Sequence, residues 1–317
     1  MILGASVGPE AGLAGITAAL CYWVGDNTRF ARSSASLCSE LGEAVMLGQL
    51  FRMPLFGIFA VEETPSDGDA PRLPRSGKLV LYGLSAGAGI LTVWGLNHLL
   101  GTSLEGFPCF PDVFISAADY AMVLLYVPAG LVLYLFYRAS ERIAGAGAEK
   151  VPAVWKETLC GIAVGIMCVL VPMAMFSGED QLADLINGYG SYSPWILIGV
   201  CLLKIPMTAF CIRFGLKGGH FFPLIFACSC MGVGISILAF SDPYSHAAFA
   251  AGVITAATLG AQLKKPFAAT VLMLLCFPVR MIIWLFIAAA AGGYLAKLLD
   301  KRMRPEAPAS GSSAEDA

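Results

Sequence analysis

Charged residues are scarce in this chain of 317 residues: only 13% are Asp, Glu, Lys or Arg, whereas 57% are apolar. This balance is far too apolar for a soluble domain of such length, and it predicts a membrane protein that crosses the bilayer several times. The net charge of −2 contains no basic excess, which argues against a nucleic-acid partner.

Paired cysteine motifs are also missing. The ten cysteines show no CxxC clusters and lie mostly in apolar stretches, so we interpret them as small core residues and expect neither a disulfide framework nor a metal site. The chain has no Ser-His-Asp arrangement, HExxH motif or nucleotide-binding glycine loop placed where it would work. We therefore expect no enzyme activity and no cofactor.

Long apolar runs make up most of the chain. Gly8-Pro9 interrupts the first run, Gly4–Trp23, and Pro54 interrupts Glu40–Ala60, so we predict half-helices in both. The fold class is therefore predicted to be an all-α, polytopic membrane protein with tilted and discontinuous helices. The remaining runs are Leu79–Leu100, Tyr120–Tyr137, Thr158–Phe176, Pro194–Ile212, Leu224–Phe240, His246–Leu263 and Pro266–Leu298, the last expected to form a half-helix and a longer helix.

Loops that carry Lys or Arg alternate with loops that carry none, from Lys78 to the C-terminus. The positive-inside rule then places the C-terminus and the Glu62–Lys78 loop in the cytoplasm, and we expect the membrane to be the plasma membrane. We predict a transmembrane domain over residues 1–299 and a short disordered cytoplasmic tail over 300–317, where the composition becomes small and polar.

The stretch Lys217–Pro223 carries the strongest chemical signal. Two glycines precede a long apolar run, and Pro223 suits the first turn of a helix. The main-chain N–H groups of His220, Phe221 and Phe222 are therefore expected to lie unpaired at a helix start inside an apolar protein. Together with the helix dipole, such N–H groups bind an anion without a cationic side chain.

A second glycine-proline break lies near the N-terminus. We predict that the N–H groups of Ser6, Val7 and Gly8 form the other wall of the same site, as facing helix starts do in transporters with discontinuous helices. The alternative is that each break is a kink in a packed helix. The two breaks together with the alternating charges favour the anion site.

Three further residues have two interpretations each. Glu62 and Glu63 end an apolar run and are either a solvated helix end, which their spacing favours, or a proton-loading site. His220 either titrates near neutral pH or, as we prefer, faces protein so that only its N–H matters.

These motifs resemble those of the CLC family of chloride channels and chloride/proton antiporters. Gly219–Pro223 resembles the GxFxP filter motif, Val7-Gly8-Pro9 the end of the GxEGP motif, and Met53–Glu63 the family segment that ends in Glu-Glu. The matches run in family order over about Gly4–Leu298. The resemblance implies a CLC-like homodimer with one pore per subunit, embedded in membrane lipid, that transports chloride or another small anion.

Val7 departs from the family pattern, because the family has its gating glutamate at this position, where it couples proton movement to chloride. Val7 cannot take a proton, which favours an uncoupled, voltage-gated-type chloride channel. Glu10 lies three residues further on and would need a different geometry. Glu63 aligns with the internal proton glutamate of the antiporters, so the alternative is a chloride/proton antiporter that uses Glu63, alone or with Glu10.

Two hydroxyl-bearing motifs of the family have no match. The serine-bearing GSGIP motif is absent, and Tyr294 lies too early to be the filter tyrosine. The opening Met1–Leu20 lacks the basic start of a signal peptide and resembles the middle of a fold. We therefore expect a fragment or a shortened variant, and a non-conducting membrane protein remains a further alternative.

Overall fold

The computed structural model describes residues 4–28, 35–51, 56–57, 75–101 and 107–303. These residues form α-helices joined by short turns, and the only strand-like pairing among them is an isolated bridge between Gly8 and Gly219. The helices are α1 (Glu10–Asn27), α2 (Ala35–Leu50), α4 (Arg75–Leu100), α5 (Ala117–Glu149), α6 (Ala153–Leu170), α7 (Glu179–Gly188), α8 (Pro194–Arg213), α9 (Phe221–Ala239), α10 (Tyr244–Leu263), α11 (Pro266–Met273) and α12 (Ile282–Met303), with single 3₁₀ turns at Pro172–Ala174, Tyr189–Ser191 and Val279–Met281.

Seven of the described helical segments are long and apolar enough to cross a membrane. They lie in α4, α5, α6, α8, α9, α10 and the stretch Val279–Arg302 that contains α12. The predicted all-α, polytopic fold is confirmed, and the block Pro266–Leu298 divides as expected into the short α11 and the long α12.

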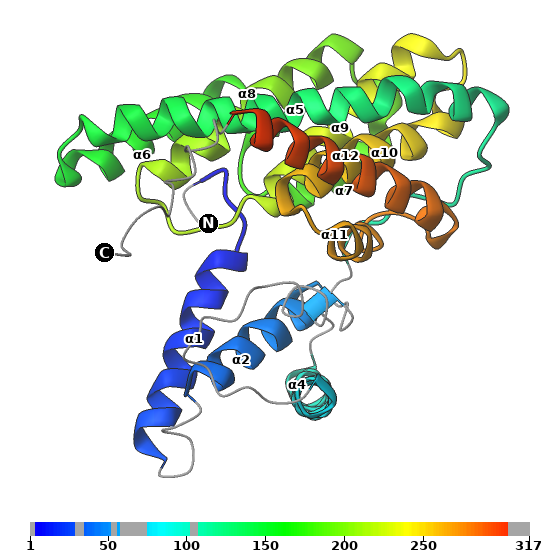
Figure 1. Ribbon diagram of the computed structural model, residues 1–317. Coiled ribbons are helices and arrows are strands. Elements are labelled where there is room, and N and C mark those ends of the chain that lie inside the picture. The colour runs from blue at the N-terminus through cyan, green and yellow to red at the C-terminus, as the bar shows by residue number, and fades with distance from the viewer. Residues whose placement is uncertain (1–3, 29–34, 52–55, 58–74, 102–106, 304–317) are drawn as a thin grey trace, which may run out of the picture.

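The helices form two groups (Figure 1). The larger group is the bundle of α5 to α12, in which α10 is buried almost throughout and packs against α5, α9 and α12. In the smaller group, α1 packs on α2 and α2 packs on α4. Phe51, directly after α2, contacts the larger group by packing its ring against Phe221 and Phe222 at the start of α9.

Small residues allow the helices around α10 to approach closely. A Cβ on Gly130 of α5 would lie 2.6 Å from the carbonyl oxygen of Ile254, and a Cβ on Gly292 of α12 would lie 2.1 Å from that of Ala257. Such close contacts are typical of membrane helices, where packing takes the place of a hydrophobic driving force. These glycines therefore let α5 and α12 pack directly against the backbone of α10.

Several predicted boundaries shift. The first helix begins at Glu10 and not at Gly4, because residues 4–9 are held by contacts with other segments. The last helix runs to Met303, past the boundary predicted at residue 299, because Asp300 pairs with Arg138 of α5 and Lys264 after α10. Residues 304–317 of the predicted tail lie outside the described part of the chain.

Candidate anion site at two helix starts

The two glycine-proline segments meet, as predicted. The N–H of Gly8 donates to the carbonyl of Gly219 over 2.8 Å, and the N–H of Gly219 donates back to the carbonyl of Gly8 over 2.9 Å. Glycine is required here because a Cβ on Gly218 would lie 2.5 Å from the side chain of Val7. The bridge therefore fixes the two segments side by side.

Both helix starts lie next to this bridge. Helix α1 begins at Glu10, directly after Pro9, and α9 begins at Phe221, directly after His220. Among the described residues, neither Pro9 nor His220 caps its helix with a side-chain hydrogen bond. The first N–H groups of each helix have no carbonyl partner within the helix, so two positive helix ends converge at one place.

The side chain of Glu10 occupies the place where the two helix starts converge. Its Oε1 accepts a hydrogen bond from the N–H of Phe221 over 2.9 Å, and the residue is 3% exposed. Its Oε2 is buried without a hydrogen-bond partner in the described part of the chain. The carboxylate lies against Gly8 and Gly219, where an added Cβ would come within 1.9 and 2.1 Å of carboxyl atoms. A carboxylate of the protein therefore sits on the N–H that we predicted to bind an anion.

Two of the predicted N–H donors are engaged elsewhere, which corrects our expectation for them. The N–H of Val7 donates to the carbonyl of Ala5 over 2.9 Å, and that of Gly8 forms the bridge. The reason is that this segment turns tightly over residues 5–7 and then pairs with Gly219, so both N–H groups bond to main chain. The side chain of Val7, which stands at the predicted gating position, is 4% exposed and packs into an apolar cluster with Cys160, Val164, Cys211 and Phe214.

Ser6 and Lys204 anchor the segment that leads to the bridge. The hydroxyl of Ser6 hydrogen-bonds the hydroxyl of Thr208 over 3.1 Å, and Thr208 donates to the carbonyl of Lys204 over 2.9 Å. The Nζ of Lys204 donates to the carbonyls of Ala174, Met175 and Phe176 over 3.1, 2.9 and 2.8 Å. This buried lysine, which lies within the apolar run Pro194–Ile212, holds the turn after α6. The N–H of Phe176 in that turn donates to the carbonyl of Gly4 over 3.2 Å.

The ring of His220 faces protein. It stacks on Tyr137 of α5 with ring centroids 5.6 Å apart and lies 4.6 Å from the ring of Phe221. Its Nε2 is buried and has no partner among the residues described. This geometry agrees with the interpretation we preferred for His220.

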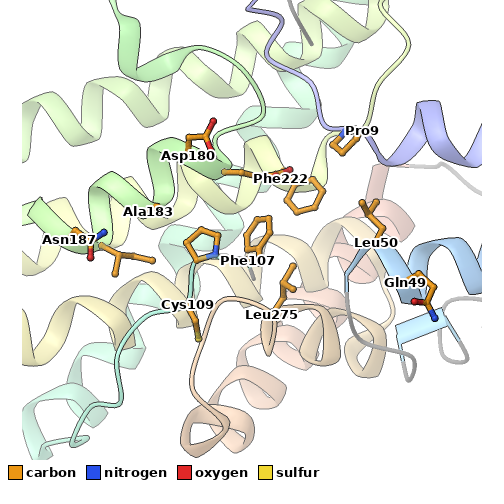
Figure 2. Close-up of a pocket in the computed structure, with 13 residues that line it drawn as sticks. Pro9, Gln49, Leu50, Phe107, Cys109, Asp180, Ala183, Asn187, Phe222 and Leu275 are labelled. Carbon is orange, nitrogen blue, oxygen red and sulfur yellow. The ribbon is translucent and has the colours of Figure 1, made fainter. Parts of the chain in front are cut away.

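A cavity of about 640 Å³ adjoins both helix starts (Figure 2). Pro9 and Phe222 line it from the two starts, and Phe107 stacks on Phe222 with ring centroids 4.9 Å apart. Glu179 and Asp180 line it from α7. Burial raises the pKa of the Glu179 carboxyl above its ordinary value, and the neighbouring charge of Asp180 raises it further. Acidic side chains therefore line a cavity that lies next to the bridge.

Sequence reasoning identified Glu10 but not its position. The signal available was a proline followed at once by an acidic residue, a common way to begin a helix. Its carboxylate reaches α9 only because the bridge brings two distant segments together. The predicted residues Glu62 and Glu63 lie outside the described part of the chain.

Seven described helices long and apolar enough to cross a bilayer define an integral membrane protein. The chain belongs to the voltage-gated chloride channel family, whose model matches residues 1–297. Among curated proteins, none matches it.

Two solved structures with a similar fold are antiporters. A CLC-type fluoride/proton antiporter superposes with a TM-score of 0.70 at 20% identity, over 93% of this chain and 71% of that chain. A slow cyanobacterial Cl−/H+ antiporter superposes with a TM-score of 0.74 at 19% identity, over 94% of this chain and 69% of that chain. At this level of identity the likeness shows the fold.

Proposed function

We propose that this protein carries chloride or another small halide across a membrane through the site where α1 and α9 begin. The observation that supports the proposal is that two helix starts meet at the bridge between Gly8 and Gly219, where a carboxylate from the first turn of α1 binds the N–H of Phe221 at the start of α9. A group that binds a carboxylate through an N–H at a helix start also suits a free anion.

The proposed ligands are main-chain N–H groups. At the start of α9 the ligands are the N–H groups of His220, Phe221 and Phe222. At the start of α1 they are the N–H groups of the helical residues before Leu13, because Leu13 is the first whose N–H donates back to Pro9. N–H groups and helix dipoles replace part of the hydration shell of an anion, yet they bind it weakly enough to let it leave. This set replaces the N–H groups of Val7 and Gly8 in our first prediction, whereas the N–H of Ser6 stays a prediction.

The mode we propose first is an uncoupled channel, because Val7 leaves the usual gating position without a titratable group. A chloride/proton antiporter is the second candidate. It is favoured by Glu10, which places a carboxylate within the site, and by the two antiporters that share the fold. A homodimer in the plasma membrane, with the C-terminus in the cytoplasm, remains our prediction.

Flux measurements on the full chain test the proposal. The purified protein is reconstituted in vesicles loaded with potassium chloride, a potassium ionophore is added, and chloride efflux is recorded with an electrode. Efflux faster than from protein-free vesicles supports anion transport, and equal efflux overturns it. A pH dye inside the vesicles separates the modes: a chloride gradient that drives protons uphill indicates an antiporter, and a chloride flux without proton movement indicates a channel.

A further inference from the structure

We propose that the carboxylate of Glu10 is a tethered anion that closes the site, and that a free anion binds only after this carboxylate has left the start of α9. The inference rests on the proposed function and states how the same site is regulated. It concerns a residue three positions after the one where the family pattern places a glutamate.

The first argument is that Glu10 and a free anion need the same donor. The N–H of Phe221 already donates to Oε1 of Glu10 over 2.9 Å, so it is not available to a second acceptor in this conformation. The carboxylate also brings its negative charge to the positive end of α9, where a free anion would gain the same stabilisation. The two are therefore mutually exclusive occupants.

The second argument is that the carboxylate is incompletely bound. Its Oε2 is buried without a partner among the residues described, and a buried oxygen without a hydrogen bond disfavours the state that contains it. A side chain held in this way is displaced more readily than one with both oxygens satisfied. The cavity lined by Pro9 and Phe222 supplies open space beside the site.

The third argument is that, in the part of the chain that the structure describes, no other side chain takes this role at the bridge. Val7 cannot, because its side chain is 4% exposed and packs with Cys160, Cys211 and Phe214. The slot between Gly8 and Gly219 is filled by Glu10, since a Cβ on Gly219 would lie 2.1 Å from the carboxyl carbon. The first turn of α1 thus supplies the charge that residue 7 lacks.

Protonation of Glu10 removes its charge and weakens its hold on the helix start, so acid is expected to open the site. The negative charges of Glu179 and Asp180, which line the adjoining cavity from α7, favour the same step. A protonated His220 would oppose it by attracting the carboxylate. Among the described residues, the titratable groups that face the site are Glu179 and Asp180 from α7, His220 before α9 and Tyr137 from α5; α2 contributes the uncharged Gln49 and Leu50.

The test compares wild type with Glu10→Ala and Glu10→Gln, and uses Glu157→Gln on the exposed surface of α6 as the matched control. In the vesicle assay, wild-type efflux is expected to rise as the pH falls. Glu10→Ala is expected to raise efflux at neutral pH about tenfold, because it removes a competing carboxylate whose binding free energy is about 1.4 kcal/mol. The variant is also expected to lose the pH dependence. Glu157→Gln is expected to keep the wild-type profile.

Halide binding gives a second readout that does not require transport. Thermal unfolding in detergent is measured in sodium bromide and in sodium gluconate. Bromide is expected to stabilise Glu10→Ala more than wild type, because the vacated N–H groups bind it. If neither protein conducts but Glu10→Ala alone gains stability from bromide, the transport proposal fails and the tethered carboxylate stands.

The inference is overturned if Glu10→Ala matches wild type in bromide stabilisation and, where flux is seen, in pH profile. Should Glu10→Ala fail to fold, Glu10→Gln decides the question, because glutamine keeps the size of the side chain and cannot carry the charge. A pH-independent flux or a bromide-stabilised fold in Glu10→Gln supports the inference, and wild-type behaviour in both assays contradicts it.

Discussion

The carboxylate of Glu10 lies 2.9 Å from the main-chain nitrogen of Phe221, although 211 residues separate the two in the sequence. This contact joins the start of α1 to the start of α9, and through them the smaller helix group to the bundle (Figure 1). A site predicted to hold a free anion therefore holds a carboxylate of the protein itself. The regulation that we propose depends on the Glu10 carboxylate occupying the place of the free anion.

Gly219→Ala is predicted to disturb Glu10 and little else. The new Cβ would lie 2.1 Å from the carboxyl carbon and 2.2 Å from Cγ of Glu10, so the side chain must leave the slot. We expect a loss of about 1 kcal/mol in stability together with a higher anion flux at neutral pH. Combining Gly219→Ala with Glu10→Ala removes the clash, and the double-mutant cycle is expected to give a coupling of about 1 kcal/mol.

The control for this cycle is Gly165→Ala on α6, because a Cβ there meets nothing within 4 Å. Its effect is expected to be small and additive with Glu10→Ala. Chemical denaturation in detergent measures the free energy of unfolding of all of the variants. A coupling near zero between residues 219 and 10 would show that the alanine methyl is accommodated without moving the carboxylate.

The sequence was sufficient to predict the helices and the positions of the two breaks, for local physical reasons. Apolar runs of about 20 residues must form helices in a bilayer, because each backbone polar group must bond within its own segment. A glycine with a proline nearby precedes each helix start, Gly8 before Glu10 and Gly219 before Phe221, and marks it through local backbone geometry. These features depend on residues close together in the chain.

The details of the site depended on distant residues and were not predictable in the same way. Whether the N–H of Val7 is free depends on the pairing between Gly8 and Gly219, and sequence spacing does not reveal such a pairing. Lys204 looked anomalous in an apolar run because its three carbonyl partners belong to the turn after α6. Asp300 likewise binds basic partners that are distant in the sequence, Arg138 on α5 and Lys264 after α10.

Lys204→Met is predicted to destabilise the protein by about 3 kcal/mol or more. The side chain is fully buried, and its ammonium group binds three main-chain carbonyls, which methionine would leave without their donor. Thermal unfolding in detergent measures the effect. Lys297→Met, on the exposed face of α12, is the control and is expected to be close to wild type. Equal stability of the two variants would contradict a structural role for the buried ammonium group.

Glu179→Gln is predicted to change how stability depends on pH. Burial and the charge of Asp180 raise the pKa of Glu179 in the folded protein, so the folded state prefers the protonated carboxyl. The stability that the protonated Glu179 carboxyl contributes to the fold is therefore fully present below the ordinary carboxyl pKa of 4.5. It is lost as the pH rises through the raised pKa. Glutamine stays neutral, so the variant should gain stability relative to wild type as the pH rises above 4.5.

Unfolding midpoints of both proteins, measured at several pH values on either side of 4.5, check this prediction. Asp242→Asn, in the loop before α10, serves as the control variant. The predicted topology places Asp242 on the same side of the membrane as Glu179. A constant difference between wild type and Glu179→Gln across the pH range would rule out the titration and leave only a packing effect.

Val7→Glu is predicted to fail as a way to restore a gate. The family pattern suggests that glutamate at this position would slow permeation and make it pH-dependent, but the side chain of Val7 packs among Cys160, Cys211 and Phe214. A carboxylate there would be buried without a partner, which we expect to cost about 3 kcal/mol or more. Val7→Ile is the matched control, with an expected cost below about 1.5 kcal/mol. Stable, monodisperse Val7→Glu protein whose flux is newly blocked at neutral pH and restored by acid would show that residue 7 reaches the anion path, and would transfer to it the role assigned to Glu10.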